Sequence, residues 1–291
     1  MRIAFWRALL IEWRKGLSIP DEQDGRRILV TAVEAYSAAM FTVAAEAYDR
    51  FMGRYSIPLA PRFCDFSQIT AGQRVLDVGC GPGALTAELV KRLGPAGVSA
   101  VEPSEPFVEA ARERHPGVDV RQAVAEELPF QDGEFDASLA QLVVHFMASP
   151  IGGLSEMARV TRPGGVVAAC VWDHNAGGEG ALIRFWEAAR ELDPGLEDES
   201  ELAGSRRGHL AELLREAGLE EVEETALSVS VEHATFDEWW EPFTFGVGTV
   251  GAYLSQLGQE QQARLREHCR DAFPEEGLVQ AARAWAARGR V

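Results

Sequence analysis

Three glycines stand close together in the segment Asp77-Val-Gly-Cys-Gly-Pro-Gly83, directly after a short apolar run. Glycine lets the backbone adopt positive φ or approach a ligand closely, which larger residues do not permit. A helical pattern follows at once, from Ala84 to Leu93, so the free N–H groups of its first turn would face the same space. Strand, tight turn and helix in this order predict a loop that binds a nucleotide-like ligand.

A second strand is predicted from Gly97 to Glu102, and it ends in an acid. In doubly wound sheets an acid about 20 residues after the glycines accepts hydrogen bonds from ribose hydroxyls, and Glu102 stands at that distance. The third glycine of the loop, however, comes one residue earlier than the dinucleotide pattern Gly-x-Gly-x-x-Gly requires, and Pro82 stiffens the turn. The spacing therefore disfavours a nicotinamide dinucleotide as the ligand.

The glycine segment with Asp77 before it resembles motif I of the class I S-adenosylmethionine-dependent methyltransferases. The loop Ala125 to Phe130 and the junction Arg159 to Gly165 are similar to the same family, and the resemblance covers about Phe41 to Trp172. Within the family, the chain looks like the branch that includes ubiquinone/menaquinone-biosynthesis methyltransferases. The resemblance implies S-adenosylmethionine as cofactor and direct in-line methyl transfer to a small-molecule acceptor.

The resemblance also implies a set of residues around the cofactor, in which Asp77 and the loop meet its amino acid portion and Glu102 its ribose. The family commonly has an Asp four residues before the Leu-Pro pair of the adenine-side loop, where this chain has Val124. Adenine is therefore expected to meet Glu126 or the backbone. The predicted cofactor residues are Asp77, Gly79, Cys80, Gly81, Gly83, Glu102, Pro103, Glu126 and Gln141.

A base is needed only if the acceptor carries a proton. His145 is the first candidate for a catalytic base, since its neutral form is accessible near pH 7. The alternative is a structural histidine, and His174, preceded by Asp173, is the second candidate. No pair of His, Cys or acidic residues stands at recognisable metal-ligand spacing in the loops at the strand ends, so no metal is expected.

Two aromatic segments are predicted to enclose the acceptor. One runs from Tyr48 to Tyr55 and resembles a family segment that closes over cofactor and substrate; the other is an aromatic stretch that contains Trp239, Trp240, Phe243 and Phe245. The predicted acceptor contacts are Tyr48, Tyr55, Trp239 and Trp240. The alternative is that these aromatics anchor the second segment to the sheet.

The predicted fold is α/β: a doubly wound, mostly parallel seven-stranded sheet with helices on both faces, the Rossmann-like methyltransferase fold. We expect an N-terminal helical extension over residues 1–40 and a methyltransferase domain over 41–291. That domain would include a helical insertion at about 235–273, between the last two strands. The last strand is expected from Leu278 to Arg288, although its alanines suit a helix equally well.

Composition limits the partners. A formal net charge of -17 opposes binding to nucleic acid, whose recognition usually needs a basic patch. The four cysteines Cys64, Cys80, Cys170 and Cys269 are far apart, which indicates free thiols in a reducing cytoplasm. The opening amphipathic stretch, Met1 to Lys15, is too interrupted for a signal peptide or a membrane span, so no stable membrane insertion is expected. The oligomeric state stays open.

Three other functions stay open beside small-molecule methylation. An S-adenosylmethionine-binding protein without catalysis would keep Gly79 and Glu102 but lack a lined acceptor pocket. A nicotinamide-dependent oxidoreductase is disfavoured by the glycine spacing. An arsenite methyltransferase would need several cysteines converging on one site, which these scattered positions do not indicate.

Overall fold

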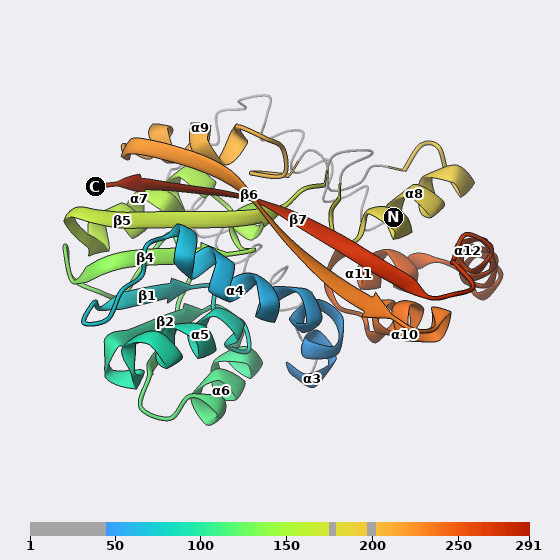
Figure 1. Cartoon of the computed structure of the whole chain (residues 1–291), viewed down its shortest axis with the longest axis horizontal. Helices are drawn as coiled ribbons and strands as arrows, with labels where there is room; N and C mark the ends of the chain where they lie inside the picture. The colour runs from blue at the N-terminus through green and yellow to red at the C-terminus, as the bar shows by residue number, and fades with distance from the viewer. Residues whose placement is uncertain (1–44, 175–178, 197–201) are drawn as a thin grey trace, which may run out of the picture. The chain divides into compact units, whose positions relative to one another are not determined.

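The computed structural model describes residues 45–174, 179–196 and 202–291. Seven strands form one sheet in the order β3-β2-β1-β4-β5-β7-β6, with helices on both sides (Figure 1). The predicted seven-stranded doubly wound architecture is thus confirmed. The predicted N-terminal extension over residues 1–40 lies outside the described residues.

Strands β3, β2, β1, β4 and β5 run parallel to one another, while β7 runs antiparallel to both of its neighbours, β5 and β6. The strands are β1 (Val75–Val78), β2 (Val98–Glu102), β3 (Asp119–Gln122), β4 (Phe135–Gln141), β5 (Thr161–Trp172), β6 (Glu220–His233) and β7 (Leu278–Arg290). β5 begins before the expected Val166, because Thr161 already pairs with Phe135 ahead of a register shift.

The helices and helical turns alternate with the strands and then fill the space between β6 and β7. They are α3 (Ala45–Tyr48), η1 (Asp49–Gly53), α4 (Arg54–Phe66), α5 (Ala84–Leu93), η2 (Pro95–Gly97), α6 (Glu105–Arg114), η3 (Val144–Phe146), α7 (Pro150–Val160), α8 (Ile183–Leu192), α9 (His209–Glu216), α10 (Phe236–Trp240), η5 (Glu241–Phe245), α11 (Gly248–Gln256) and α12 (Gln259–Asp271). η1 is a π-helix, a form that occurs frequently at functional sites.

The central strands β1, β2, β4 and β5 are buried on both faces, and alternate residues belong to different cores. Leu139 and Cys170 pack in a core with residues of α4 and α5, whereas Ala140 and Val171 pack in a second core with residues of α7 and α9. This two-sided burial explains why β5 is a continuous apolar run from Val166 to Trp172 rather than an alternating one. It also leaves the carboxyl ends of the parallel strands as the open edge of the sheet.

β7 is a strand despite its alanines, so the helical alternative is wrong. Its backbone pairs with β5 from Ala284 to Arg290 and with β6 along nearly its whole length. Ala282, Ala284 and Ala286 are fully buried, and their small side chains allow helices to pack close to the strand.

The first residues of β7, before Ala284, pair with β6 alone and form a two-stranded ribbon that runs past the other strands toward α10 and α12 (Figure 1). The predicted helical insertion is connected to the sheet through this ribbon, since α10 to α12 lie between β6 and β7 in the chain. Among the described residues, no helix is both long enough and apolar enough to span a membrane. All four cysteines are free and buried.

Candidate active site

The glycine loop is built on three residues with positive φ, at 72° for Gly79, 53° for Gly81 and 101° for Gly83. A Cβ atom at Gly79 would lie 2.6 Å from both Cγ atoms of Val143, so the backbone there is packed against the start of the next loop. A Cβ atom at Gly81 would meet nothing within 4 Å. The loop is therefore closed on one side and open at Gly81, where a ligand has room.

Two buried carboxyl groups lie beside this loop. Glu102 Oε2 accepts from the backbone N–H of Gly81 at 2.9 Å, and Oε1 accepts from Ser104 N–H at 3.0 Å. Asp77 Oδ2 accepts from the hydroxyl of Thr86 at 2.6 Å. Burial raises the pKa of each carboxyl to about 7, and for Asp77 the neighbouring charge of Glu102 adds to the rise. In the described parts of the chain, neither acid has a cationic partner, so the site favours a ligand that brings positive charge or hydroxyl donors.

The other predicted cofactor residues surround the same loop but already take part in the protein's own hydrogen bonds. The Cys80 thiol donates to Gly81 O, and burial raises its pKa. The carbonyl of Pro103 accepts from Gln122, and Glu126 Oε1 accepts from Ser149 N–H at 3.0 Å. Gln141 Nε2 donates to Ser56 O, while its Oε1 has no partner. Contacts of these residues with a cofactor stay predictions.

We call the segment Ala45–Gly53 the cover segment. One arginine of α6, Arg114, contacts both this segment and the glycine loop. The guanidinium of Arg114 lies 2.7 Å from Asp49 Oδ2 and donates to the carbonyl of Pro82 at 3.2 Å. The next residue, His115, donates from Nε2 to the carbonyl of Gly83. The end of α6 therefore ties the cover segment and the loop together. Neither residue carried a recognisable sequence signal.

Tyr48 joins the cover segment to Glu102 and to a cavity. Its ring packs edge-on against Phe107, with 5.4 Å between centroids. Burial raises the pKa of Tyr48, and the negative charges of Glu102 and Asp49 raise it further. The tyrosine therefore lies between the carboxylate that ends β2 and the space at the ends of β4 and β5.

That space is a cavity of about 40 Å³ between the cover segment, the ends of β4 and β5 and the start of α11. Most of its walls are apolar or aromatic. The described residues that line it are Tyr48, Phe51, Met52, Leu142, His145, Phe146, Trp172, His174, Leu182, Val247, Gly248 and Thr249. We call this the central cavity.

His145 follows β4 and is half-buried at the cavity, as predicted for a residue at a strand's carboxyl end. Its Nδ1 is buried without a hydrogen-bond partner, and its ring centroid lies 6.0 Å from that of His174. Desolvation, helped by His174, lowers the pKa of His145 well below its ordinary value. The imidazole is therefore neutral near pH 7, as a base must be. Its catalytic role stays a prediction.

His174 also lines the cavity. The carboxyl group of its neighbour Asp173 is held by an arginine of the sheet. Arg283 on β7 donates from two nitrogens to Asp173 Oδ2, at 2.9 and 2.6 Å. Trp172 completes this end of β5; the sequence analysis used it only as the end of a strand. Its signal would have been an aromatic residue with a polar N–H at the carboxyl end of a parallel strand.

The structure does not bring the other three predicted acceptor residues to the central cavity. The hydroxyl of buried Tyr55 lies 3.1 Å from His233 Nε2, and Arg54 donates to Nδ1 of the same ring, which fixes α4 to the end of β6. Trp239 and Trp240 are each 5% exposed and pack against Phe243. Of the four predicted contacts, Tyr48 alone lines the central cavity, and acceptor contacts of the other three stay predictions.

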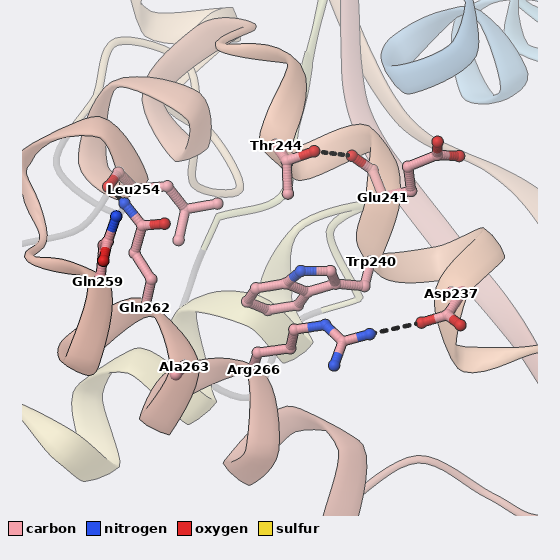
Figure 2. A pocket seen from close by; sticks show the side chains of 9 residues that line it. All are labelled: Asp237, Trp240, Glu241, Thr244, Leu254, Gln259, Gln262, Ala263 and Arg266. Atoms are coloured by element: carbon pink, nitrogen blue, oxygen red, sulfur yellow. Dashed lines mark hydrogen bonds and ion pairs between the residues drawn. The ribbon is translucent and has the colours of Figure 1, made fainter.

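A second hollow, of about 590 Å³, lies within the insertion (Figure 2). Residues of α10, η5, α11 and α12 line it, including Trp240, and its Arg266 and Asp237 form an ion pair at 2.7 Å. None of its lining residues belongs to the loops at the strand ends. Although it is larger than the central cavity, it has no contact with the glycine loop, so we place the candidate active site at the central cavity.

Within residues 45–174, 179–196 and 202–291, no group of three or more His, Cys, Asp or Glu side chains is arranged to hold a metal ion.

Comparisons with known proteins agree with this geometry. Residues 76–169 match the family described as a methyltransferase domain. An uncharacterized methyltransferase of Mycobacterium bovis is 38% identical over 133 residues, which cover 46% of this chain and 51% of that protein. The ubiquinone/menaquinone biosynthesis C-methyltransferase of Bdellovibrio bacteriovorus is 31% identical over 156 residues, 50% of this chain and 66% of that protein. The chain spans 31% to 51% of the length of the first curated relatives that it matches.

The fold also resembles that of a solved structure described as a putative methyltransferase. A putative methyltransferase from an antibiotic biosynthesis pathway of Anabaena variabilis superposes with a TM-score of 0.56 at 18% identity, covering 79% of this chain and 96% of that one. Together, the sheet order, the glycine loop and these matches show that this chain carries a methyltransferase domain of class I fold. Its relatives include the ubiquinone/menaquinone-biosynthesis branch that the sequence resembles.

Proposed function

We propose that the protein transfers a methyl group from S-adenosylmethionine to a small-molecule acceptor by direct in-line displacement. The observation that carries the proposal is the open space at Gly81 beside the buried carboxyl of Glu102, which has no cationic partner in the described parts of the chain. The glycines carry no Cβ, so a nucleoside can approach the loop closely, and the acid at the end of β2 can accept hydrogen bonds from its hydroxyls. The two acids can also attract the positively charged groups of the donor. The residues present therefore fit this donor.

Within this proposal, S-adenosylmethionine supplies a methyl group on a sulfonium, which is already a good leaving group. Glu102 accepts hydrogen bonds from the ribose hydroxyls, and Asp77, held by Thr86, adds negative charge below the loop. Tyr48 and Phe51 exclude water from the central cavity. Positioning of this kind is worth effective molarities of roughly 10⁵ M or more, so no covalent intermediate with the protein is required.

The test is binding of S-adenosylhomocysteine, measured by calorimetry, to the wild type and to Glu102→Ala. We expect the variant to bind about 5-fold to 150-fold more weakly, because the ribose hydroxyls lose an acceptor worth about 1 to 3 kcal/mol. Glu223→Ala, on the exposed part of β6, is the matched control. Unchanged affinity in a folded Glu102→Ala protein, or binding of NAD in place of S-adenosylhomocysteine, would contradict the proposal.

Loss of the Arg114 side chain should speed release of the donor product. In Arg114→Gln, the ion pair with Asp49 and the bond to Pro82 O are both removed, so the cover segment loses a tie to the loop. We expect the dissociation rate of S-adenosylhomocysteine to rise roughly 5-fold to 10-fold, as for a partly buried charged contact worth about 1 kcal/mol or slightly more. Stopped-flow displacement measures it. Arg121→Gln, on another surface ion pair, serves as control; equal rates in all three proteins would show that the tie has no role in retention.

Binding without catalysis is the second function to separate from this one. The lined central cavity, with a neutral histidine beside the predicted donor site, supports catalysis over simple binding. Formation of S-adenosylhomocysteine with a panel of metabolites distinguishes the two.

A further inference from the structure

Two polar atoms in the lining of the central cavity have no hydrogen-bond partner among the residues that the structure describes. They are Nδ1 of His145 and Nε1 of Trp172. Trp172 is 3% exposed, so water does not satisfy its N–H, and an indole nitrogen can only donate. Buried polar groups are nearly always paired in folded proteins. Two orphaned groups in one cavity therefore indicate a ligand that supplies the missing partners.

The rest of the lining limits the charge of that ligand. Of the described residues around the cavity, none is an Asp, Glu, Lys or Arg. A carboxylate, phosphate or ammonium would lose its hydration there without gaining a counter-charge from the lining, which is strongly unfavourable. The aromatic walls of Tyr48, Phe51 and Phe146 instead offer rigid contact area to a flat, apolar molecule.

The size of the cavity shows how such a ligand would enter. About 40 Å³ is room for no more than a few water molecules, each of which needs roughly 10–15 Å³ of such space. The acceptor can therefore enter only if a wall moves. The cover segment supplies Tyr48, Phe51 and Met52 to that wall, and in the described chain it is helical and not part of the sheet.

We propose that the methyl acceptor is an uncharged, planar molecule with a hydroxyl group that donates to His145 and a second oxygen that accepts from the indole N–H of Trp172. This inference rests on the proposed function and names the substrate class of the same site. Under this inference Trp172 determines which acceptor binds, and His145 takes up the proton of the acceptor's hydroxyl group.

The chemical step balances within this site. A bond forms between the hydroxyl oxygen and the methyl carbon, while the carbon–sulfur bond of the donor breaks and leaves its electron pair on sulfur. The hydroxyl proton passes to His145, which later releases it to water. The positive charge moves from the sulfonium to the imidazolium, so the net charge of the closed cavity does not change.

The first experiment measures binding of small probes to the protein saturated with S-adenosylhomocysteine. The probes are meta-hydroxyacetophenone, acetophenone, phenol, meta-hydroxybenzoate and benzylamine. We expect meta-hydroxyacetophenone to bind roughly tenfold more tightly than acetophenone, which lacks the hydroxyl, and than phenol, which lacks the second oxygen. The two charged probes should bind more weakly still. Trp172→Phe should abolish the advantage over phenol.

Trp285→Phe is the matched control, because Trp285 pairs in the sheet with Val171, the residue before Trp172. Its indole N–H also has no partner among the described residues, but it does not line the cavity. It should leave all probe affinities unchanged. Stronger binding of the benzoate or the amine, or no binding of meta-hydroxyacetophenone up to its solubility limit, would overturn the inference. The proposed function fails separately, if S-adenosylhomocysteine itself does not bind.

The second experiment tests the proton. With meta-hydroxyacetophenone as acceptor, His145→Gln should lower kcat by roughly 100-fold or more, the range for loss of a general base. The loss should shrink as the pH approaches the acceptor's own pKa, because a phenolate needs no base. A loss that is the same at every pH would show that His145 acts only through the structure and would overturn its assignment.

Discussion

Two glycines of the same loop should respond to alanine in opposite ways. Gly79→Ala is expected to destabilise the protein by about 3 kcal/mol, since the new Cβ would meet Val143 at 2.6 Å and the backbone has φ of 72°. Gly81→Ala should cost only about 1 kcal/mol, because its φ of 53° is the least strained left-handed value and its Cβ enters open space.

Binding should show the reverse order. The methyl group at Gly81 would occupy the space that we assign to the donor, so Gly81→Ala should bind S-adenosylhomocysteine at least about tenfold more weakly, a loss of about 1.4 kcal/mol. Urea unfolding gives the stabilities and calorimetry gives the affinities. Gly72→Ala, which also has positive φ and open space but lies before β1, controls for backbone strain. If Gly81→Ala bound the ligand as the wild type does, the ligand would have to lie elsewhere.

Affinity for S-adenosylhomocysteine should fall steeply as the pH drops from 8 to 6. Burial raises the pKa of Asp77 and of Glu102 to about 7, so the ionised fraction of each falls from about nine tenths at pH 8 to about one tenth at pH 6. The ionised forms accept hydroxyl donors and attract the ammonium group of the ligand. We expect a loss of about tenfold if one carboxylate is required, and about a hundredfold if both are.

The unliganded protein should show the opposite trend in stability. The folded-state pKa of each acid lies above its unfolded value of about 4, so their contribution to stability is complete below pH 4 and is lost as the pH rises to about 7. The increase in melting temperature on adding the ligand should therefore grow between pH 6 and pH 8. Glu102→Gln should flatten the pH dependence of binding, and an affinity independent of pH in the wild type would contradict the assignment.

The part of the site that depends on local sequence could be predicted closely. The run from Val75 to Leu93 carries strand, turn and helix signals that need no distant partner, and α5 begins and ends at the expected residues. Glu102 could be placed beside the loop because a crossover connection brings consecutive parallel strands together. The expected pairing of consecutive parallel strands thus turned a local sequence pattern into a prediction of where Glu102 lies.

The predictions that depended on tertiary packing were weaker. The sequence alone does not tell whether Trp239 and Trp240 line a cavity or pack in the core. Only their packing against Phe243 and Phe185 distinguishes these two roles. Arg114 offers no local signal either, since its partners Asp49 and Pro82 come from two other elements, η1 and the glycine loop. Alanines in β7 likewise fit a strand only because strands flank it on both sides.

The position of β7 has a consequence for how the chain is made. This strand comes last among the described elements, yet it lies inside the sheet, between β5 and β6. While a ribosome still holds these residues, β5 and β6 are already synthesised but have no partner on the side that β7 will occupy. Unpaired edges of this kind are prone to aggregate, and charged side chains oppose such pairing. β6 carries five glutamates, Glu220, Glu221, Glu223, Glu224 and Glu232, which would keep nascent chains apart until the final strand is released.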